Sequence, residues 1–192
     1  MPHILSNRSK NRLEFSIHPA ALPAFTFYHS RKFWADKTTI SRSSLADINR
    51  GLMLNAVKSS KNKIAIISGF ESFSFSLATL SLADCNVIML DEISDKDIER
   101  RAWISVLRSL LSSIDNSSAE DFRRALNQCT PKPILNMIFD TNKLSQRQLA
   151  GIIHSSRSTL AQQNAKASAQ LTTPSKELSI FEQLLRERKQ DV

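Results

Sequence analysis

Apolar and polar positions follow two different spacings along this chain. Up to about residue 92, short apolar runs bounded by Gly, Pro and Ser mix with segments of helical spacing. The runs indicate strands at residues 13–17, 53–57, 63–68 and 87–90, the second and third forming a hairpin or a neighbouring pair. The helical segments are residues 44–50, which Gly51 ends, and 71–83, with Phe73, Leu77 and Leu80 on one face.

Beyond residue 92 every predicted element is a helix. Ser94 caps a long helix that ends near Ile114, with Asp97 completing a capping box, and two shorter helices follow at 118–128 and 134–139. The apolar face of the long helix consists of Trp103, Val106, Leu107, Leu110 and Leu111. The pattern predicts an α/β domain over residues 1–92, an all-α domain over 93–165 and a polar, unstructured tail over 166–192.

The all-α domain contains a predicted helix-turn-helix at residues 144–163. Ser145 is a suitable N-cap for its first helix, and Ser156 for the second. Leu149, Ile152 and Ile153 give the first helix an apolar stripe, and Leu160 turns the second helix back onto it. Two short helices joined by three or four residues have the spacing of a DNA-reading motif.

In such a motif the leading residues of the second helix enter the major groove. Arg bonds guanine, Gln bonds adenine, and Ser and Thr bond bases or phosphates, while a polar residue in the first turn of the first helix suits a phosphate contact. The expected DNA-binding residues are therefore Gln146, Ser156, Arg157, Ser158, Thr159, Gln162 and Gln163. From residue 141 to residue 176 the chain has no acidic residue, which favours the approach of a polyanion.

Two positions in the turn differ from the usual pattern. The tight turn favours Gly, yet His154 stands there, although His tolerates a left-handed backbone better than most residues. The next position is usually apolar, and here it is Ser155. An ordinary helical hairpin with polar caps is the alternative interpretation of the same residues.

The two ends of the chain carry additional candidate surfaces. Residues 1–12 are predicted to be a flexible basic arm, and Pro19 and Pro23 to interrupt regular structure. Aromatic residues then alternate with basic ones, which suits either stacking on single-stranded nucleic acid or packing in the core: Phe25, Phe27, Tyr28, Phe33 and Trp34. At the other end, Leu178–Lys189 has the spacing of an amphipathic helix, with Phe181, Leu184 and Leu185 on a face for docking or self-association.

Composition narrows the class of protein. The 192 residues are 41% hydrophobic, with no apolar run of membrane-spanning length and no secretory leader, so a cytoplasmic location is expected. Cys85 and Cys129 form no metal-binding spacing. The net charge of +8 lies in residues 1–63, where 11 Lys and Arg face three acidic residues. That excess fits either a solvated surface or a second contact with nucleic acid.

Taken together, these elements resemble the ParB family of partition proteins, within the ParB and sulfiredoxin superfamily. The residues that resemble the family's segments are Leu45–Leu52 (LADINRGL), Lys63–Gly69 (KIAIISG), Asn86–Asp91 (NVIMLD), the SDKDIERRAW helix and the motif LSQRQLAGIIHSSRSTL. The resemblance implies a ParB/sulfiredoxin-like α/β domain followed by a helix-turn-helix domain. It also implies sequence-specific binding of double-stranded DNA in plasmid or chromosome partition or in transcriptional regulation. A homodimer and a partition ATPase are the implied protein partners, and the nucleoid or a plasmid is the implied location.

The resemblance also places a nucleotide-binding box that begins at Gly69. In the family, arginines of this box contact the triphosphate of CTP, whereas this chain has GFESFS, leaving Gly69, Glu71 and Ser72 as the weak candidate contacts. We therefore expect no cofactor, no bound metal and no CTP hydrolysis.

The alternative is an enzyme, because some members of the superfamily are nucleases or nucleotide hydrolases, including the fertility-inhibition protein Osa of conjugative plasmids. Glu71, Asp91 and Glu92 would then be the carboxylates that hold a divalent metal.

Overall fold

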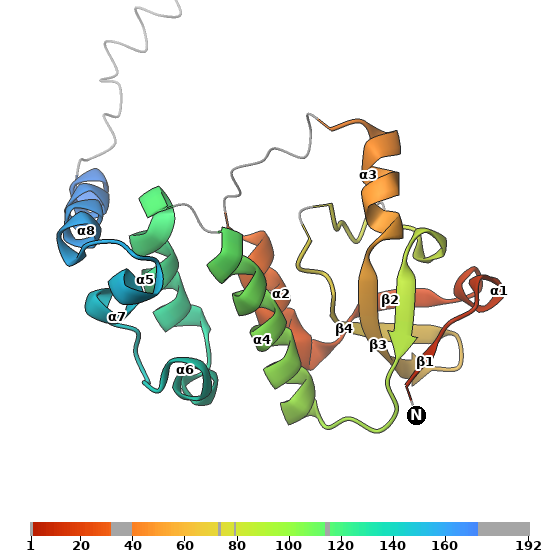
Figure 1. The fold of residues 1–192 in the computed structure, drawn as a ribbon. Coiled ribbons are helices and arrows are strands. Elements are labelled where there is room, and N and C mark those ends of the chain that lie inside the picture. The colour runs from red at the N-terminus through yellow and green to blue at the C-terminus, as the bar shows by residue number, and fades with distance from the viewer. Residues whose placement is uncertain (1, 32–39, 73, 79, 114–115, 173–192) are drawn as a thin grey trace, which may run out of the picture.

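A five-stranded mixed sheet organises the first half of the chain (Figure 1). The computed structural model describes residues 2–31, 40–72, 74–78, 80–113 and 116–172. In sheet order the strands are β1 (His3–Ile4), β5 (Asn86–Met89), β3 (Met53–Ser60), β4 (Lys63–Ser68) and β2 (Glu14–Ile17). β3 and β4 form an antiparallel hairpin, as the sequence predicts, while β2 runs parallel to β4 and β5 parallel to β3.

Two helices cover the sheet and are themselves packed together. They are α2 (Leu22–His29), which follows the 3₁₀ turn η1 (Pro19–Ala21), and α4 (Asp95–Ser113) (Figure 1). Pro23 does not interrupt regular structure, because it lies in the first turn of α2, where the missing N–H has no helical partner to lose. Ser94 caps α4 as predicted, accepting a hydrogen bond from the amide of Asp97 at 3.2 Å.

Of the aromatic residues that alternate with basic ones after Pro23, those that the structure describes lie in the core. Phe27 and Tyr28 are each 3% exposed, and Phe25 is partly buried against Phe70 and Phe75. Core packing therefore accounts for these three rings, and stacking on single-stranded nucleic acid does not. Phe33 and Trp34 lie outside the described residues.

The predicted flexible arm is ordered structure instead. Residues 2–12 supply β1 and the short helix α1 (Asn7–Lys10). Lys10 is buried, and its ammonium donates hydrogen bonds to the carbonyl of Cys85 at 2.6 Å and to Asn7 Oδ1 at 3.2 Å. Because a buried charge needs such partners, these bonds fix the arm against the sheet.

The predicted helix at 71–83 is also wrong. The described part of this stretch forms turns, followed by the 3₁₀ turn η3 (Leu82–Asp84). Ser72 and Ser74 bond each other through their hydroxyls at 2.8 Å, and Ser72 Oγ accepts from the Ser74 amide. Serine side chains that satisfy nearby backbone groups compete with helix formation. In this stretch the local serine bonds form and the helix does not. Leu77 is 41% exposed and does not join a buried face.

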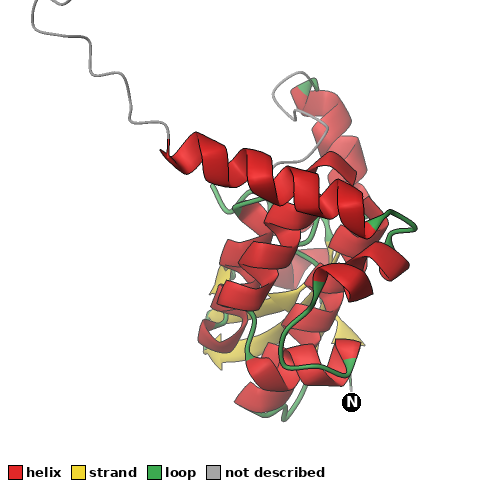
Figure 2. Cartoon of the chain, turned by 90° about the vertical axis from the view of Figure 1, so that its left-hand side faces the viewer, coloured by secondary structure: helices red, strands yellow, loops and turns green. Residues whose placement is uncertain are grey.

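The second half of the chain is helical. It contains η4 (Asn116–Ser118), α5 (Ala119–Cys129), α6 (Lys132–Phe139), α7 (Gln146–Ile152) and α8 (Arg157–Thr172), whereas α3 (Arg42–Arg50) belongs to the α/β half. Figure 2 shows α8 lying across the other helices at one end of the molecule. α8 continues seven residues past residue 165, where the predicted all-α domain ends, since this stretch is rich in alanine and other helix-compatible residues.

α4 packs with the sheet, although the sequence analysis assigned it to the all-α domain. It lies against β4, η1 and α2. Of its predicted core face, Trp103, Val106, Leu107 and Leu110 are buried, and Leu111 is partly buried. The chain is thus a mixed α/β protein with additional helices, and the finer ParB/sulfiredoxin assignment stays a prediction. In the part that the structure describes, no helix is both long enough and apolar enough to span a membrane.

Candidate nucleic-acid interface

The first helix of the predicted motif begins where its sequence indicates. Ser145 Oγ accepts a hydrogen bond from the Gln148 amide at 3.2 Å, and Gln148 Oε1 accepts one from the Ser145 amide at 3.0 Å. This reciprocal capping box satisfies two amides that would otherwise lack partners. Leu149 and Ala150 are buried beneath it, so α7 is anchored as well as capped.

The turn between the two helices forms without glycine. His154 has φ 51°, the left-handed conformation that the sequence analysis assigned to this position. The amide of Ser155 donates to the carbonyl of Ala150 at 2.9 Å, closing the end of α7 across the turn. This six-residue hydrogen bond is the one that ends many helices at a left-handed residue.

The second helix presents its first turn to solvent. Ser156 Oγ caps α8 by accepting from the Thr159 amide at 3.0 Å, and it also bonds the hydroxyls of Ser158 and Thr159. Leu160 is fully buried and holds α8 against the rest of the motif. The residues exposed on this helix include Arg157, Ser158, Thr159 and Gln162, all of them predicted DNA contacts.

Gln146 and Gln163 are turned toward α5 instead. Gln163 Oε1 accepts a hydrogen bond from the Glu120 amide at 3.1 Å, and Gln146 bonds the Glu120 side chain. Both glutamines are half-buried. Their hydrogen bonds join the helix-turn-helix to α5, so the structure separates these two residues from the exposed set.

A buried ion pair lies at the centre of this junction. The guanidinium of Arg123 donates to both carboxylate oxygens of Glu120, at 2.9 and 2.7 Å, and to the carbonyl of Leu144 at 3.0 Å. Asn127 bonds the amide and the carbonyl of Leu144. Burial by itself raises the pKa of Glu120, but the hydrogen bonds and charge of Arg123, with the bond from Gln146, lower it overall.

Sequence reasoning missed this junction. Glu120 and Arg123 stand three residues apart on an amphipathic helix, and Leu144 follows about twenty residues later. The i,i+3 spacing of opposite charges was visible, but such pairs are usually solvent-exposed. Nothing in the local sequence indicated that Glu120 would be only 1% exposed.

A basic depression adjoins the leading turn of α8. It has a volume of about 640 Å³ and is lined by Leu144, Ser145, Gln146, Asn164 and four basic residues, Arg123, Lys143, Arg147 and Arg157. Glu120 is buried beneath Arg123 and paired with it, so its carboxylate adds no net negative charge to this surface. The depression therefore offers positive side chains and hydrogen-bond donors to an anionic ligand.

The candidate nucleotide-binding residues lie at a different, internal position. Gly69 has φ 94°, and its amide donates to Glu71 Oε2 at 2.8 Å. Ser105 of α4 donates a hydrogen bond to Glu71 Oε1. The hydroxyl of Ser72 bonds Ser74. The Gly69 amide and the side chains of Glu71 and Ser72 therefore all have hydrogen-bond partners within the fold.

The three carboxylates of the metal-site hypothesis do not converge. A Cβ at Gly69 would meet Met53, so Glu71 lies near the start of β3, whereas Asp91 and Glu92 follow the opposite end of β5. Among the described residues no group of three His, Cys, Asp or Glu side chains is placed to hold a metal ion. Burial also raises the pKa of Cys85 to about 11, which leaves little thiolate at neutral pH.

Comparison of the chain with models of known protein families, with curated proteins and with solved structures finds no match in any of the three.

Proposed function

We propose that this chain binds double-stranded DNA with sequence preference through the leading turn of α8. The observation that carries the proposal is the exposed, Ser156-capped end of α8, with Arg157 in its first turn and Lys143 and Arg147 beside it. A helix end that projects from a compact support, next to positive charge, suits insertion into the major groove.

The exposed residues divide into two roles. Arg157 and Gln162 carry the hydrogen-bonding groups that read base edges, and Ser156, Ser158 and Thr159 supply hydroxyls to bases or phosphates. Lys143 and Arg147, at the rim of the depression, are placed to contact the phosphate backbone. Gln146 and Gln163 hold the motif on α5 in this proposal.

In the cell, such a protein would act in plasmid or chromosome partition or in transcriptional control, as a homodimer on a two-part site. A partition ATPase is the protein partner that goes with the partition role. The alternative of a nuclease or nucleotide hydrolase gains no support from the loop at Gly69 or from the placement of Glu71, Asp91 and Glu92.

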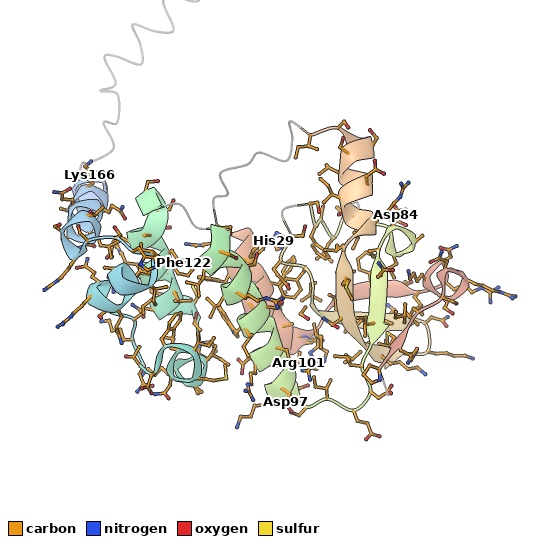
Figure 3. The ribbon with its side chains drawn as sticks, in the orientation of Figure 1. His29, Asp84, Asp97, Arg101, Phe122 and Lys166 are labelled. Atoms are coloured by element: carbon orange, nitrogen blue, oxygen red, sulfur yellow. The ribbon has the colours of Figure 1, made fainter. Side chains whose placement is uncertain are left out.

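The decisive experiment removes the arginine at the leading turn. After bound sites are selected from random duplex DNA, Arg157→Ala should weaken binding to the selected site by about 1–3 kcal/mol, because a bidentate base contact is lost. Non-specific binding should change much less. Arg101→Ala is the matched control, since Arg101 is an exposed arginine near the far end of α4, away from α8 (Figure 3).

A second pair of variants separates backbone contact from base reading. Lys143→Ala and Arg147→Ala should weaken binding to all sequences alike and make the affinity less dependent on salt. Equal losses on specific and random duplexes for Arg157→Ala would contradict base reading by α8. No binding by the unaltered chain to any selected duplex would contradict the proposal as a whole.

A further inference from the structure

A cavity lies among the N-terminal elements, at the opposite end of β3 and β4 from Gly69. It has a volume of about 330 Å³ and is walled by β1 with α1, by the turn of the β3–β4 hairpin and by the residues that end β5. Its floor is aliphatic and consists of Leu5, Leu13, Ile64, Met89 and Leu90. The isoleucine and the methionine are buried and the three leucines are partly buried, so the floor of the cavity is an edge of the core.

Backbone hydrogen bonds hold the walls of this cavity in position. The Leu5 amide donates to the carbonyl of Val87 at 2.9 Å, which fixes the end of β1 on β5. The Glu14 amide donates to the carbonyl of Asn62 at 3.0 Å, which ties the stretch after α1 to the hairpin turn. Buried Lys10 fixes α1 itself by its bond to the strand that follows. The cavity is therefore pre-formed, and a ligand needs to order little of the protein when it binds.

The rim of the cavity is basic. Lys58, Lys61 and Lys63 come from the hairpin and are exposed. Lys63 pairs with Glu14 at 2.7 Å, whereas Lys58 and Lys61 form no ion pair and no side-chain hydrogen bond with the described residues. Asp91 is the acidic residue of the lining, so the three lysines leave the lining with a net positive charge. Two ammonium groups are thus available to an anion beside the aliphatic floor.

The chemistry of the lining indicates the kind of ligand. Apart from the imidazole of His3, no ring belongs to the lining that the structure describes. Bases of nucleotides usually stack on aromatic side chains, so this floor suits an aliphatic chain better than a nucleobase. Met89 adds a flexible thioether that adapts to such a chain. The volume lies near the lower end of the range of about 300–1,000 Å³ for small-molecule sites, which fits a short chain rather than a long lipid tail.

We propose that this cavity binds a small aliphatic anion, of which a medium-chain carboxylate is the simplest example. The hydrocarbon chain lies on the aliphatic floor, and the carboxylate accepts hydrogen bonds from the ammonium groups of Lys58 and Lys61. The inference does not rest on DNA binding, since α1 and β1 lie at the other end of the molecule from α8 (Figure 1). The predicted amphipathic segment Leu178–Lys189 lies outside the described residues and takes no part in this site.

The first test measures binding to the full chain by calorimetry. Decanoate should bind about tenfold more tightly than octanoate, because two more methylene groups leave water. Acetate, which has the same head group without the chain, should show no binding. Decyltrimethylammonium, which has the same chain with a positive head group, should bind at least tenfold more weakly than decanoate. No binding of decanoate, an affinity that does not depend on chain length, or equal affinities for the anion and the cation would each overturn the proposal.

A pair of lysine variants tests the head-group contact. Lys58→Gln with Lys61→Gln should weaken decanoate binding at least tenfold, because both free ammonium groups are lost. Lys132→Gln with Lys166→Gln is the matched control, since these exposed lysines belong to α6 and α8, and Figure 3 shows Lys166 at the far end of the molecule. Both variants alter exposed side chains, so they should fold, which circular dichroism checks. An unchanged affinity in the first variant, or an equal loss in the control, contradicts a carboxylate held by the hairpin.

The second test locates the chain of the ligand by the methyl resonances of methionine, assigned with single Met→Leu variants. Met89 lines the cavity, whereas Met53 is 55% exposed near the other end of β3. Met137 lines a groove with Ile152, which is 41% exposed although the sequence analysis placed it on a buried stripe with Leu149. Decanoate should shift the Met89 resonance and leave the other two unchanged. No shift at Met89, or an equal shift at Met53 or Met137, would mean binding elsewhere or to any apolar surface, and would overturn the proposal.

Discussion

Two glycines have opposite surroundings in this fold. Gly69 adopts φ 94°, and a Cβ there would lie 2.1 Å from the carbonyl oxygen of Met53 and 2.8 Å from the Cα of Leu54. Gly151 lies within α7, and a Cβ there would meet nothing within 4 Å. The first glycine is required by the close approach of a loop to β3, and the second is not required by its surroundings.

The two positions should therefore respond oppositely to alanine. Gly69→Ala should lower the free energy of unfolding by more than about 1 kcal/mol, because it adds both a clash and an unfavourable backbone conformation. Gly151→Ala should raise it by about 0.5–1 kcal/mol, because alanine favours a helix interior. Urea denaturation followed by circular dichroism measures both, and a loss at Gly151 as large as that at Gly69 would refute this account.

The Glu120–Arg123 pair is the second feature argued from single residues. Both are shielded from water, with side-chain exposures of 2% and 15%. Arg123→Met should cost about 3–5 kcal/mol at pH 7, because it leaves a buried carboxylate without its partner. The double variant with Glu120→Gln should recover part of that loss.

The stability that this ion pair contributes should depend on pH. Because the pKa of Glu120 is lowered in the folded chain, its contribution to stability is present above the ordinary value of 4.5 and is lost as the pH falls through the folded value. In Arg123→Met only the bond from Gln146 and the charge of Arg124 oppose burial, so the pKa of Glu120 should be higher than in the unaltered chain and the penalty should shrink toward acid pH. Denaturation at pH 7 and pH 4 should show the gap between the two proteins narrowing, and a constant gap would exclude this carboxylate as its cause.

At the scale of elements, local rules predicted three helix starts, and they failed both where side chains bond the nearby backbone and where partners lie far along the chain. Ser94, Ser145 and Ser156 each cap a helix as expected, because a cap needs only the next three residues. The stretch 71–83 failed because its serines bond locally. The bonds of Gln146 and Gln163 to Glu120 could not be predicted, because Glu120 lies on another helix and only packing brings it close.

The turn at His154 makes a prediction of its own. With φ 51°, His154→Gly should raise the free energy of unfolding by about 1 kcal/mol, because glycine adopts this conformation without the Cβ penalty. His154→Val should lower it by more, since a β-branched residue is strongly disfavoured there. Thermal melts of the two variants beside the unaltered chain measure the difference, and a stabilising valine would contradict a left-handed turn.

At the scale of the whole molecule, one core joins the sheet to the helix-turn-helix. The Phe27 ring lies 5.3 Å from the Trp103 ring and 6.3 Å from the Phe122 ring, and Arg31 pairs with Asp121 at 3.1 Å. Figure 3 shows Phe122 on α5, next to the helices that cover the sheet. The sequence analysis divided the chain at residue 92, because the change from strands to helices does not show which helices share a core.

A shared core should unfold in one step. We expect tryptophan fluorescence and far-ultraviolet circular dichroism to give coincident urea transitions in a Trp34→Phe chain, whose remaining tryptophan, Trp103, is buried in this core. Phe122→Ala should cost about 3–5 kcal/mol by removing a buried ring at that junction. Two separated transitions in the unaltered chain would show instead that the halves unfold independently.

The sheet order also constrains how the chain is completed during synthesis. Both outer strands, β1 and β2, come from the first 17 residues, while the β5 strand that β1 must join is made some 80 residues later. Until β5 is made, β1 has no strand to pair with in the nascent chain. A deletion of residues 2–17 would strip both flanks of the sheet at once and leave β4 and β5 as bare templates for intermolecular strand addition.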